Sequence, residues 1–278
     1  MTTPKVSTIK RSGSRYYVDP DAHERKVPGV TSIIDMLGKP FLQRWAAKVV
    51  AEKAVADLGP LVSLVLADPA GAVDYLKNAP YRDTAAAAEA GTQAHGYFER
   101  MALGKPIGRV TPGMEPFVAA FDAFLEEKQP EYIHLEETVW SDEHDYAGSF
   151  DAYAVIDGER LFIDNKTTRS GIHEEVGIQL AAYRFSESII RNDGSRIPTP
   201  KADGGAVLHV RPEGARLVPV RADEAMFEIF LALREAFRFE KELKPTVVGD
   251  PVWQYGYEDE DETGPRRRTP RARKAAVK

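Results

Sequence analysis

The stretch GSFDAYAVIDGERLFIDNKTT, residues Gly148 to Thr168, decides the fold, because it predicts two antiparallel strands joined by a tight turn. Aromatic and β-branched residues, which favour strands, fill both halves of the stretch. The dipeptide between the halves, Asp157-Gly158, is favoured in two-residue type I′ hairpin turns. If the residues that flank this turn face each other, counting outward places Asp151 directly opposite Asp164.

Two carboxylates then share one face of the hairpin, and Lys166, two positions beyond Asp164, lies on that face too. Directly opposed side chains have Cβ atoms roughly 4.5 to 5.5 Å apart, so both carboxylates can ligate one cation. A divalent metal relieves their repulsion, and Mg²⁺ commonly binds one or two carboxylates together with substrate phosphates. Two alternatives stay open: a three-residue turn would separate the carboxylates, and a solvated strand face also carries acidic and basic residues.

The composition limits the class of protein. A chain of 278 residues that is 43% hydrophobic and 29% charged predicts a globular protein with one substantial core. The absence of cysteine excludes disulfides, thiolate-bound iron–sulfur clusters and cysteine nucleophiles, so a metal must bind oxygen and imidazole ligands. No apolar run resembles a secretory signal or spans a bilayer, so we expect a cytoplasmic protein without membrane contact.

The charge distribution is uneven. A net charge of -6 argues against a protein that coats nucleic acid with its whole surface, but it allows a local basic groove. Residues 251–278 are expected to form a disordered tail, in which the acidic run Glu258 to Glu262 precedes a basic half. That basic half either binds DNA phosphates or is a solvated end without a specific partner. Its cations are Arg266, Arg267, Arg268, Arg271, Arg273, Lys274 and Lys278.

Helical spacing of apolar residues predicts a mainly helical first third of the chain and four helices beyond it. Thr31 or Ser32 can cap a short helix. An amphipathic helix with Phe41 and Trp45 on its apolar face begins at Pro40, and further helix continues to about residue 77. The later helices are expected over residues 85–103, 115–128, 173–191 and 222–243.

Strands are expected over residues 132–141, 146–156, 160–167, 206–211 and 216–220, with a short strand or hairpin within 15–30. The pattern predicts an α/β fold, in which helices flank a central mixed β-sheet. Residues 1–84 form an N-terminal strand and helical region that packs on the core and roofs the groove, and residues 85–250 form the core. No internal repeat or separate second domain is visible.

Five short motifs occur in order along the chain. They are Gly-x-x-x-His with an acidic residue one turn later (Gly91, His95, Glu99), a strand glutamate (Glu137), Gly-x-x-Asp (Gly148, Asp151), Asp-x-Lys-Thr (Asp164, Lys166, Thr167) and Gln-x-x-x-Tyr (Gln179, Tyr183). Together they resemble the PD-(D/E)XK nuclease superfamily, and within it the RecB-like branch of phage and bacterial exonucleases. The resemblance covers roughly residues 85–184, and more loosely VPGVTSIIDMLGKPFLQRWAA near the N-terminus.

The chain departs from the family pattern at two positions. Asp164 stands where glutamate is commoner, a variation that the pattern permits, and Asn165 stands where an apolar or aromatic residue is more usual. RecB-like members with an iron–sulfur cluster use four cysteines, so a cluster-free subtype is implied. The resemblance implies a restriction-endonuclease-like core.

The resemblance also implies the ligands of the metal. His95, Asp151, Asp164 and the backbone carbonyl of Asn165 would bind one or two Mg²⁺ or Mn²⁺ ions, and imidazole favours Mn²⁺ tolerance. Gly91, four residues before His95, would permit close approach of the helix to the sheet. The alternative for His95 is a hydrogen-bonded structural histidine.

The remaining motif residues have catalytic or supporting roles under the same resemblance. Lys166 would orient or help to deprotonate the attacking water and offset charge in the transition state. Glu137 would hold a second ion or support Lys166, or it is simply a strand end. Gln179 and Tyr183, one helical turn apart, would contact DNA near the scissile phosphate or pack the site, with Tyr183 as plain core the alternative.

The expected function is that of a metal-dependent deoxyribonuclease, an exonuclease in DNA processing or recombination of the kind that phages encode, acting in the host cytoplasm. Expected partners are DNA and a recombination or single-strand-binding protein. One alternative is a DNA-binding or complex-assembly module that keeps the nuclease fold but does not cut. Another is a metal-dependent hydrolase with a small-molecule substrate.

Overall fold

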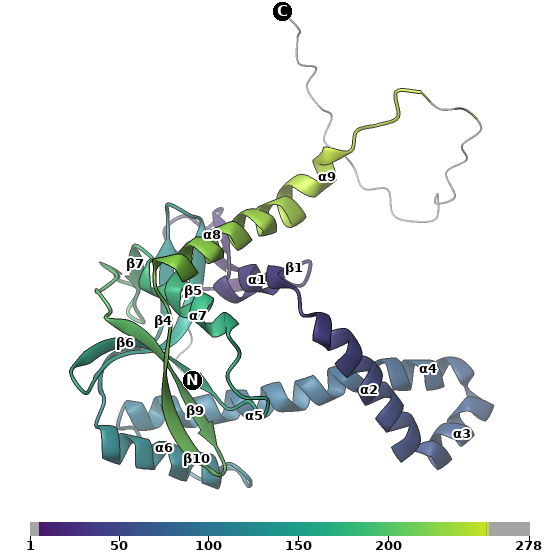
Figure 1. Cartoon of the computed structure of the whole chain (residues 1–278), viewed down its shortest axis with the longest axis horizontal. Coiled ribbons are helices and arrows are strands. Elements are labelled where there is room, and N and C mark those ends of the chain that lie inside the picture. The colour runs from purple at the N-terminus through teal and green to yellow at the C-terminus, as the bar shows by residue number, and fades with distance from the viewer. Residues whose placement is uncertain (1–5, 254, 256–278) are drawn as a thin grey trace, which may run out of the picture.

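The computed structural model of the chain describes residues 6–253 and residue 255, so most of the predicted tail lies outside the described residues. Its centre is a seven-stranded mixed sheet with the strand order β10-β9-β6-β5-β4-β7-β8, covered by helices as Figure 1 shows. The α/β class and the central mixed sheet are therefore confirmed. The strands are β4 (Glu131–Ser141), β5 (Tyr146–Ile156), β6 (Glu159–Lys166), β7 (Ser188–Ile190), β8 (Arg196–Pro198), β9 (Gly204–Arg211) and β10 (Gly214–Val220).

The hairpin of β5 and β6 has the predicted register. Asp157 and Gly158 both have positive φ values, 51° and 87°, as a type I′ turn requires. Ile156 pairs with Glu159, and the pairing continues along the two strands as far as Ala152 and Ile163. The next positions outward are Asp151 and Asp164, so the turn chemistry predicted where both carboxylates lie along the hairpin.

Strand β6 pairs in parallel with β9, whereas every other neighbouring pair in the seven-stranded sheet is antiparallel. A parallel pair needs a long crossover, which here contains α7 (Glu175–Arg184), β7 and β8. The carboxyl ends of β6 and β9 meet at one edge of the sheet, where Lys166 pairs with His209. Strand β6 therefore ends beside a second strand that runs in the same direction.

Helices cover both faces of the sheet (Figure 1). On one face, α5 (Ala79–Ala102) and α6 (Glu115–Lys128) pack Phe98 and Phe121 against Ile163. On the other face, α7 lies with α1 (Val30–Ile34) and α8 (Glu224–Arg238) around Phe162 and Phe230. Each helix thus buries its apolar side on the sheet, and His95 is carried on α5.

The N-terminal residues form a separate three-stranded sheet, β1 (Thr8–Arg11), β2 (Ser14–Val18) and β3 (Lys26–Pro28), with one strand more than the predicted hairpin. The predicted caps of the short helix were wrong. Helix α1 begins at Val30 with Gly29 as its N-cap, and neither Thr31 nor Ser32 caps it. Ser32 Oγ instead accepts a hydrogen bond from the backbone of Arg15, which ties α1 to β2.

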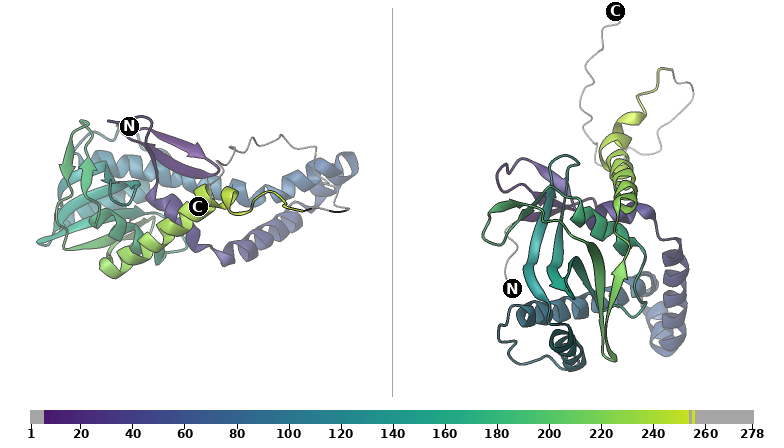
Figure 2. Two further views of the ribbon diagram at one scale, coloured as in Figure 1. Left: turned by 90° about the horizontal axis from the view of Figure 1, so that it is seen from above. Right: turned by 60° about the vertical axis from the view of Figure 1, so that its left-hand side comes forward.

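The helices α2 (Pro40–Ala56), α3 (Leu58–Ala67) and α4 (Pro69–Lys77) form what we call the helical arm, which extends from the body of the molecule in Figures 1 and 2. Helix was predicted here, but the apolar face expected to pack on the core is not buried. Within Pro40–Lys77 only Ala72 is buried. Phe41 is 56% exposed and stacks on His173 instead. The arm's main contact with the body is with α5.

Two further helix predictions need correction. The helix expected over residues 173–191 ends at Arg184, and Ser188–Ile190 forms β7, which pairs with β4. The last helix, α8, ends at Arg238 and continues as a π-helical turn over Phe239–Leu243 and the short helix α9 (Lys244–Val247). No helix among the described residues combines the length and apolarity needed to cross a membrane.

Candidate metal centre

The site lies where β5 and β6 separate. Their backbone pairing ends at Ala152 and Ile163. One position further along, the carboxylate of Asp151 accepts a hydrogen bond of 2.6 Å from the backbone N–H of Asn165. A side chain thus replaces the ladder hydrogen bond at this point. The backbone carbonyl of Asn165 as a metal ligand stays a prediction.

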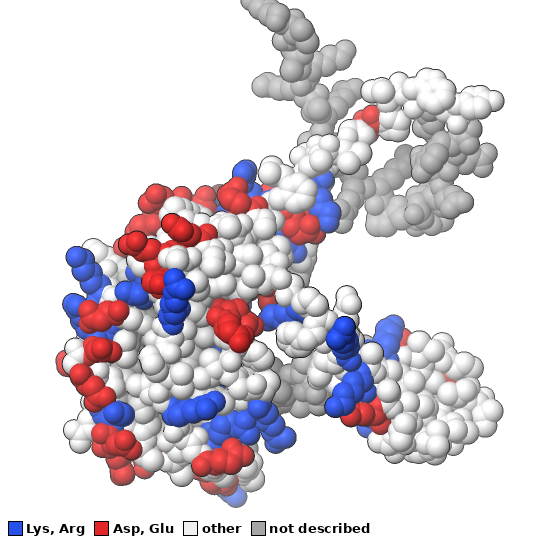
Figure 3. Space-filling view, in the orientation of Figure 1, with Lys and Arg blue, Asp and Glu red and all other residues white. Residues whose placement is uncertain are grey.

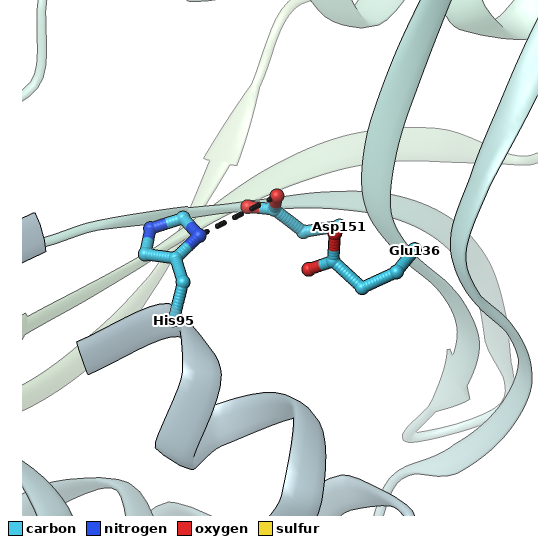
Figure 4. A group of neighbouring side chains, drawn as sticks. All are labelled: His95, Glu136 and Asp151. Atoms are coloured by element: carbon cyan, nitrogen blue, oxygen red, sulfur yellow. Dashed lines mark ion pairs between the residues drawn. The ribbon is translucent and has the colours of Figure 1, made fainter. Parts of the chain in front are cut away.

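Three potential ligands lie together beside this fork. His95 from α5, Glu136 from β4 and Asp151 from β5 each offer one ligand atom, and these atoms lie within 4.8 Å of one another. Figure 4 shows the three side chains, with the imidazole of His95 facing the carboxylate of Asp151. The distance from His95 Nδ1 to Asp151 Oδ1 is 3.6 Å. Two strands and one helix therefore supply a compact oxygen and imidazole group.

Glu136 reaches this group from a position opposite Asp151 in the pairing of β4 with β5, and its own backbone is irregular. Its φ is 51°, a left-handed conformation that costs a residue with a side chain about 1–3 kcal/mol. The pairing of β4 with β5 is recorded on either side of it, for Leu135 with Ala152 and Glu137 with Phe150. Such strain concentrates at functional sites, and here it turns a carboxylate toward His95.

The predicted residue Glu137 lies elsewhere. Its carboxylate is 2.9 Å from His134 Nδ1, accepts a hydrogen bond from the backbone N–H of Asn192 and lies 3.8 Å from Arg191. Glu137 is only 7% exposed, so these contacts neutralise a buried charge. The structure therefore places Glu136, not Glu137, beside the ligands, which strand alternation alone did not reveal.

Asp164 lies outside the compact group and is held by its own partners. Lys166 Nζ lies 2.6 Å from Asp164 Oδ2, and Gln179 Nε2 donates a hydrogen bond of 2.8 Å to Asp164 Oδ1. Gln179 also donates to the hydroxyl of Tyr183, which in turn donates to the backbone carbonyl of Ser149. Tyr183 is only 2% exposed, so it supports Gln179 from within the core and is not open to a ligand at the surface.

Burial and neighbouring charges shift the pKa values of His95, Glu136 and Asp151. Burial disfavours the protonated form of His95, but Asp151 outweighs burial and raises the pKa of His95 to about 9. Burial raises the pKa of Glu136 to about 8, and the negative charge of Asp151 adds to the effect. Burial also opposes ionisation of Asp151, yet His95 keeps its pKa below the usual value.

Burial and opposite charge also act on the pKa values of Asp164 and Lys166. Burial raises the pKa of Asp164, against the opposing charge of Lys166. Burial works against the ammonium of Lys166, but Asp164 outweighs it and raises the pKa of Lys166. His95 and Asp151, and likewise Asp164 and Lys166, are thus each influenced by a neighbour of opposite charge.

Gly91 was predicted to allow close approach of the helix to the sheet. It lies near the end of β6, but a Cβ atom there would meet Thr167 Oγ1 at 3.5 Å, an ordinary van der Waals contact. Glycine is therefore not required by space at this position. Glu99, one turn beyond His95, acts through its charge on Glu136.

The residues present suit a divalent cation. Imidazole and carboxylate oxygen are the donor set that Mn²⁺ accepts, and Mg²⁺ prefers the carboxylates. Asp164 Oδ2 is buried, and the ammonium of Lys166 lies 2.6 Å from it. A second group, Glu143, His144 and Glu187, is less suited, because Glu187 already accepts hydrogen bonds from Ser141 and Asp142.

Comparison with models of protein families and with curated proteins finds no match to this chain.

Proposed function

We propose that the chain is a metal-dependent deoxyribonuclease with a restriction-endonuclease-like core, an exonuclease of the RecB-like PD-(D/E)XK type that acts in DNA processing or recombination. The observation that carries the proposal is the compact group of His95, Glu136 and Asp151 beside the ion pair of Asp164 and Lys166. A carboxylate and imidazole group next to a half-buried ammonium is suited to phosphodiester hydrolysis.

His95, Glu136 and Asp151 would hold an Mg²⁺ or Mn²⁺ ion, with Asp164 beside it. When bound, the ion polarises a phosphoryl oxygen and lowers the pKa of a coordinated water. Asp151 is fixed by the backbone N–H of Asn165, and Asp164 by Gln179, so both carboxylates are positioned before substrate arrives. Preorganised groups of this kind need no rearrangement during the reaction.

Lys166 stabilises charge in this mechanism. Its pKa is raised by Asp164, so the side chain stays protonated at neutral pH and is not available to remove a proton from water. The ammonium orients the attacking water and offsets the negative charge that develops on the phosphorus oxygens. This favours charge stabilisation over proton abstraction, the two roles that the sequence left open.

The edge of the sheet beyond Lys166 is basic, which supports DNA as the substrate. His209, Arg211, Glu213 and Arg216 line a hollow of about 380 Å³ there. Arg211 lies 3.4 Å from Glu213 and donates a hydrogen bond to the backbone carbonyl of Arg169. Figure 3 shows Lys and Arg side chains over the part of the body where Figure 1 draws β9, β10 and α5. Such residues bind phosphates without regard to sequence.

The test is digestion of end-labelled single- and double-stranded DNA with Mn²⁺ or Mg²⁺. The unaltered chain should release nucleotides, and Asp164→Ala and Lys166→Ala should each lower the rate by at least about 100-fold, the loss seen when one charge-stabilising group is removed. Undiminished cleavage by these variants would reject the site. DNA binding without release of nucleotides under either metal would favour the non-cutting module.

A further inference from the structure

A pocket of about 740 Å³ lies beside α5 and the loop that follows it, apart from the metal ligands. Its volume falls within the range of about 300–1,000 Å³ that is typical of ligand sites. Arg100, Lys105 and Arg109 bring three cations to its wall, and Glu99 is the one carboxylate among its lining residues. The wall is thus basic, although the whole chain has a net charge of -6.

The three cations are available to a ligand. Within residues 6–253 no ion pair engages Arg100, Lys105 or Arg109, and the hydrogen bond recorded for Arg100 is a long one of 3.5 Å to the backbone carbonyl of Ile107. By contrast, Arg160 forms an ion pair with Asp203. Cations without a protein partner attract phosphate.

The pocket also contains an aromatic ring. Tyr97 lines it, and the hydroxyl of Tyr97 accepts a hydrogen bond of 2.9 Å from the backbone N–H of Thr111, which fixes the position of the ring. Cations that bind the backbone together with an aromatic ring on which a base stacks are the combination used to bind single-stranded nucleic acid. The cations and the ring together therefore match a nucleotide strand better than an isolated anion.

The pocket adjoins the metal centre along α5. Glu99, which lines the pocket, lies one helical turn beyond His95 on the same face of the helix. Gly96, next to His95, also lines the pocket, and a Cβ atom there would meet no heavy atom within 4 Å. The absent side chain therefore keeps the pocket open where it comes nearest to the metal ligands.

We propose that this pocket binds one strand of DNA, with phosphates on Arg100, Lys105 and Arg109 and a base on Tyr97. A duplex is too wide to enter a pocket of this volume, since its major groove alone measures about 12 Å across. The role in guiding a strand to the metal rests on the proposed nuclease function, whereas strand binding itself does not. We therefore expect DNA to reach the metal centre as a single strand.

The experiment measures the affinity of the full chain for a fluorescent oligothymidylate in EDTA, where no cleavage occurs. Lys105→Gln with Arg109→Gln should weaken binding about 10-fold at low salt, and the slope of log K against log salt should fall by about 0.7 for each lost phosphate contact. Lys10→Gln on β1, an exposed cation remote in the sequence and the fold, is the matched control and should change neither quantity.

A second pair of variants tests the shape of the pocket. Gly96→Leu fills the open space with a residue that favours helix, and Tyr97→Ala removes the ring; each should weaken binding roughly 5-fold or more. Tyr97→Phe keeps the ring and loses only the hydrogen bond with Thr111, so it should bind much better than Tyr97→Ala. Unchanged thermal unfolding of Gly96→Leu would show that the loss comes from the pocket.

Unchanged affinity and salt dependence in the double variant would overturn the proposal. So would tighter binding of duplex than of single strand, or thymidine monophosphate that displaces the oligonucleotide at equal affinity. Weakened strand binding in a chain that cuts no DNA would support the pocket and reject the nuclease. If the chain cuts DNA and the variants bind the strand normally, the nuclease is supported and the pocket is rejected.

Discussion

Glu136 and Glu137 are adjacent carboxylates in different surroundings, and a matched pair of substitutions distinguishes a metal ligand from a structural residue. Glu136→Gln removes a proposed ligand, so Mn²⁺ affinity should fall by at least about 10-fold, the lower range seen even for groups that only support a ligand. Its melting temperature without metal should rise at pH 8, because the folded state no longer holds a carboxyl whose pKa is raised to about 8.

Glu137→Gln should show the opposite pattern. Loss of its charge leaves His134 and the backbone of Asn192 with a weaker acceptor in a buried place, at a cost of about 1–3 kcal/mol of unfolding free energy. Mn²⁺ affinity should stay unchanged. Metal titration and thermal unfolding of both variants check this, and equal loss of Mn²⁺ affinity in the two would contradict the placement.

The titration of His95 and Glu136 predicts a pH dependence of metal binding. Their pKa values are raised to about 9 and about 8, so both side chains carry a proton at pH 7 in the metal-free protein. A metal must displace these protons. Mn²⁺ affinity should therefore increase from pH 7 to pH 9 and level off above it.

Calorimetry in buffers of different ionisation enthalpy measures the protons released. About two should leave at pH 7 and fewer than one at pH 9.5, and His95→Gln should release about one fewer at pH 7. Binding without proton release at pH 7 would show that these two side chains are not ligands.

Among the elements, β5 needs a glycine at position 148, because side chains of α1 and α7 pack directly against its backbone there. A Cβ atom at Gly148 would lie 2.7 Å from Tyr183 Cε1 and 2.8 Å from Val30 Cγ2. Gly148→Ala should therefore destabilise the fold by about 1–3 kcal/mol through overpacking. The matched control is Gly59→Ala in α3, where a Cβ atom meets nothing within 4 Å and helix propensity should add up to about 1 kcal/mol.

Urea unfolding of both variants measures the effect as a shift of the midpoint. A midpoint for Gly148→Ala equal to that of the unaltered chain would mean that α1 and α7 do not pack against β5 at this point.

The elements that the sequence predicted well are those set by local chemistry. Asp157-Gly158 determined the turn and the register of β5 and β6, and a polar pair after an apolar run identified Asp164 and Lys166. Elements set by distant contacts were missed. Strand β7 is only three residues long and is stabilised by its pairing with β4. Its apolar residues alone did not distinguish it from the end of the preceding helix, so it was predicted as helix.

The site was predictable to a similar extent. The positions of His95 and Asp151 followed from motifs, and the structure brings them together. Glu136 did not, because its position opposite Asp151 and its left-handed backbone both follow from the pairing of β4 with β5 and not from a motif. Glutamate has no special preference for that conformation, so no signal in the sequence marked it.

Across the whole molecule, burial is unequal between the body and the helical arm. The arm buries Ala72 alone, whereas Val139, Trp140 and Phe162 in the sheet are fully covered. Local unfolding is easiest where few apolar contacts oppose it. Amides of the arm should exchange with deuterium much sooner than those of β4, β5 and β6.

Exchange followed by mass spectrometry on peptic fragments gives the comparison directly. Protection of the arm equal to that of the sheet would mean that the arm is covered in solution. Leu66→Gln, at a side chain 82% exposed, should leave the unfolding free energy within about 0.5 kcal/mol.

The parallel pairing of β6 with β9 has a consequence for the order of assembly during synthesis. His95, Glu136 and Asp151 all leave the ribosome before the crossover and β9 exist, and the hairpin of β5 and β6 closes within microseconds of its own emergence. Gln179 and β9 arrive later and complete the surroundings of Asp164. A nascent chain therefore forms the hairpin before Asp164 has its hydrogen bond from Gln179, and until the crossover folds the charge of Lys166 is what opposes that of Asp164.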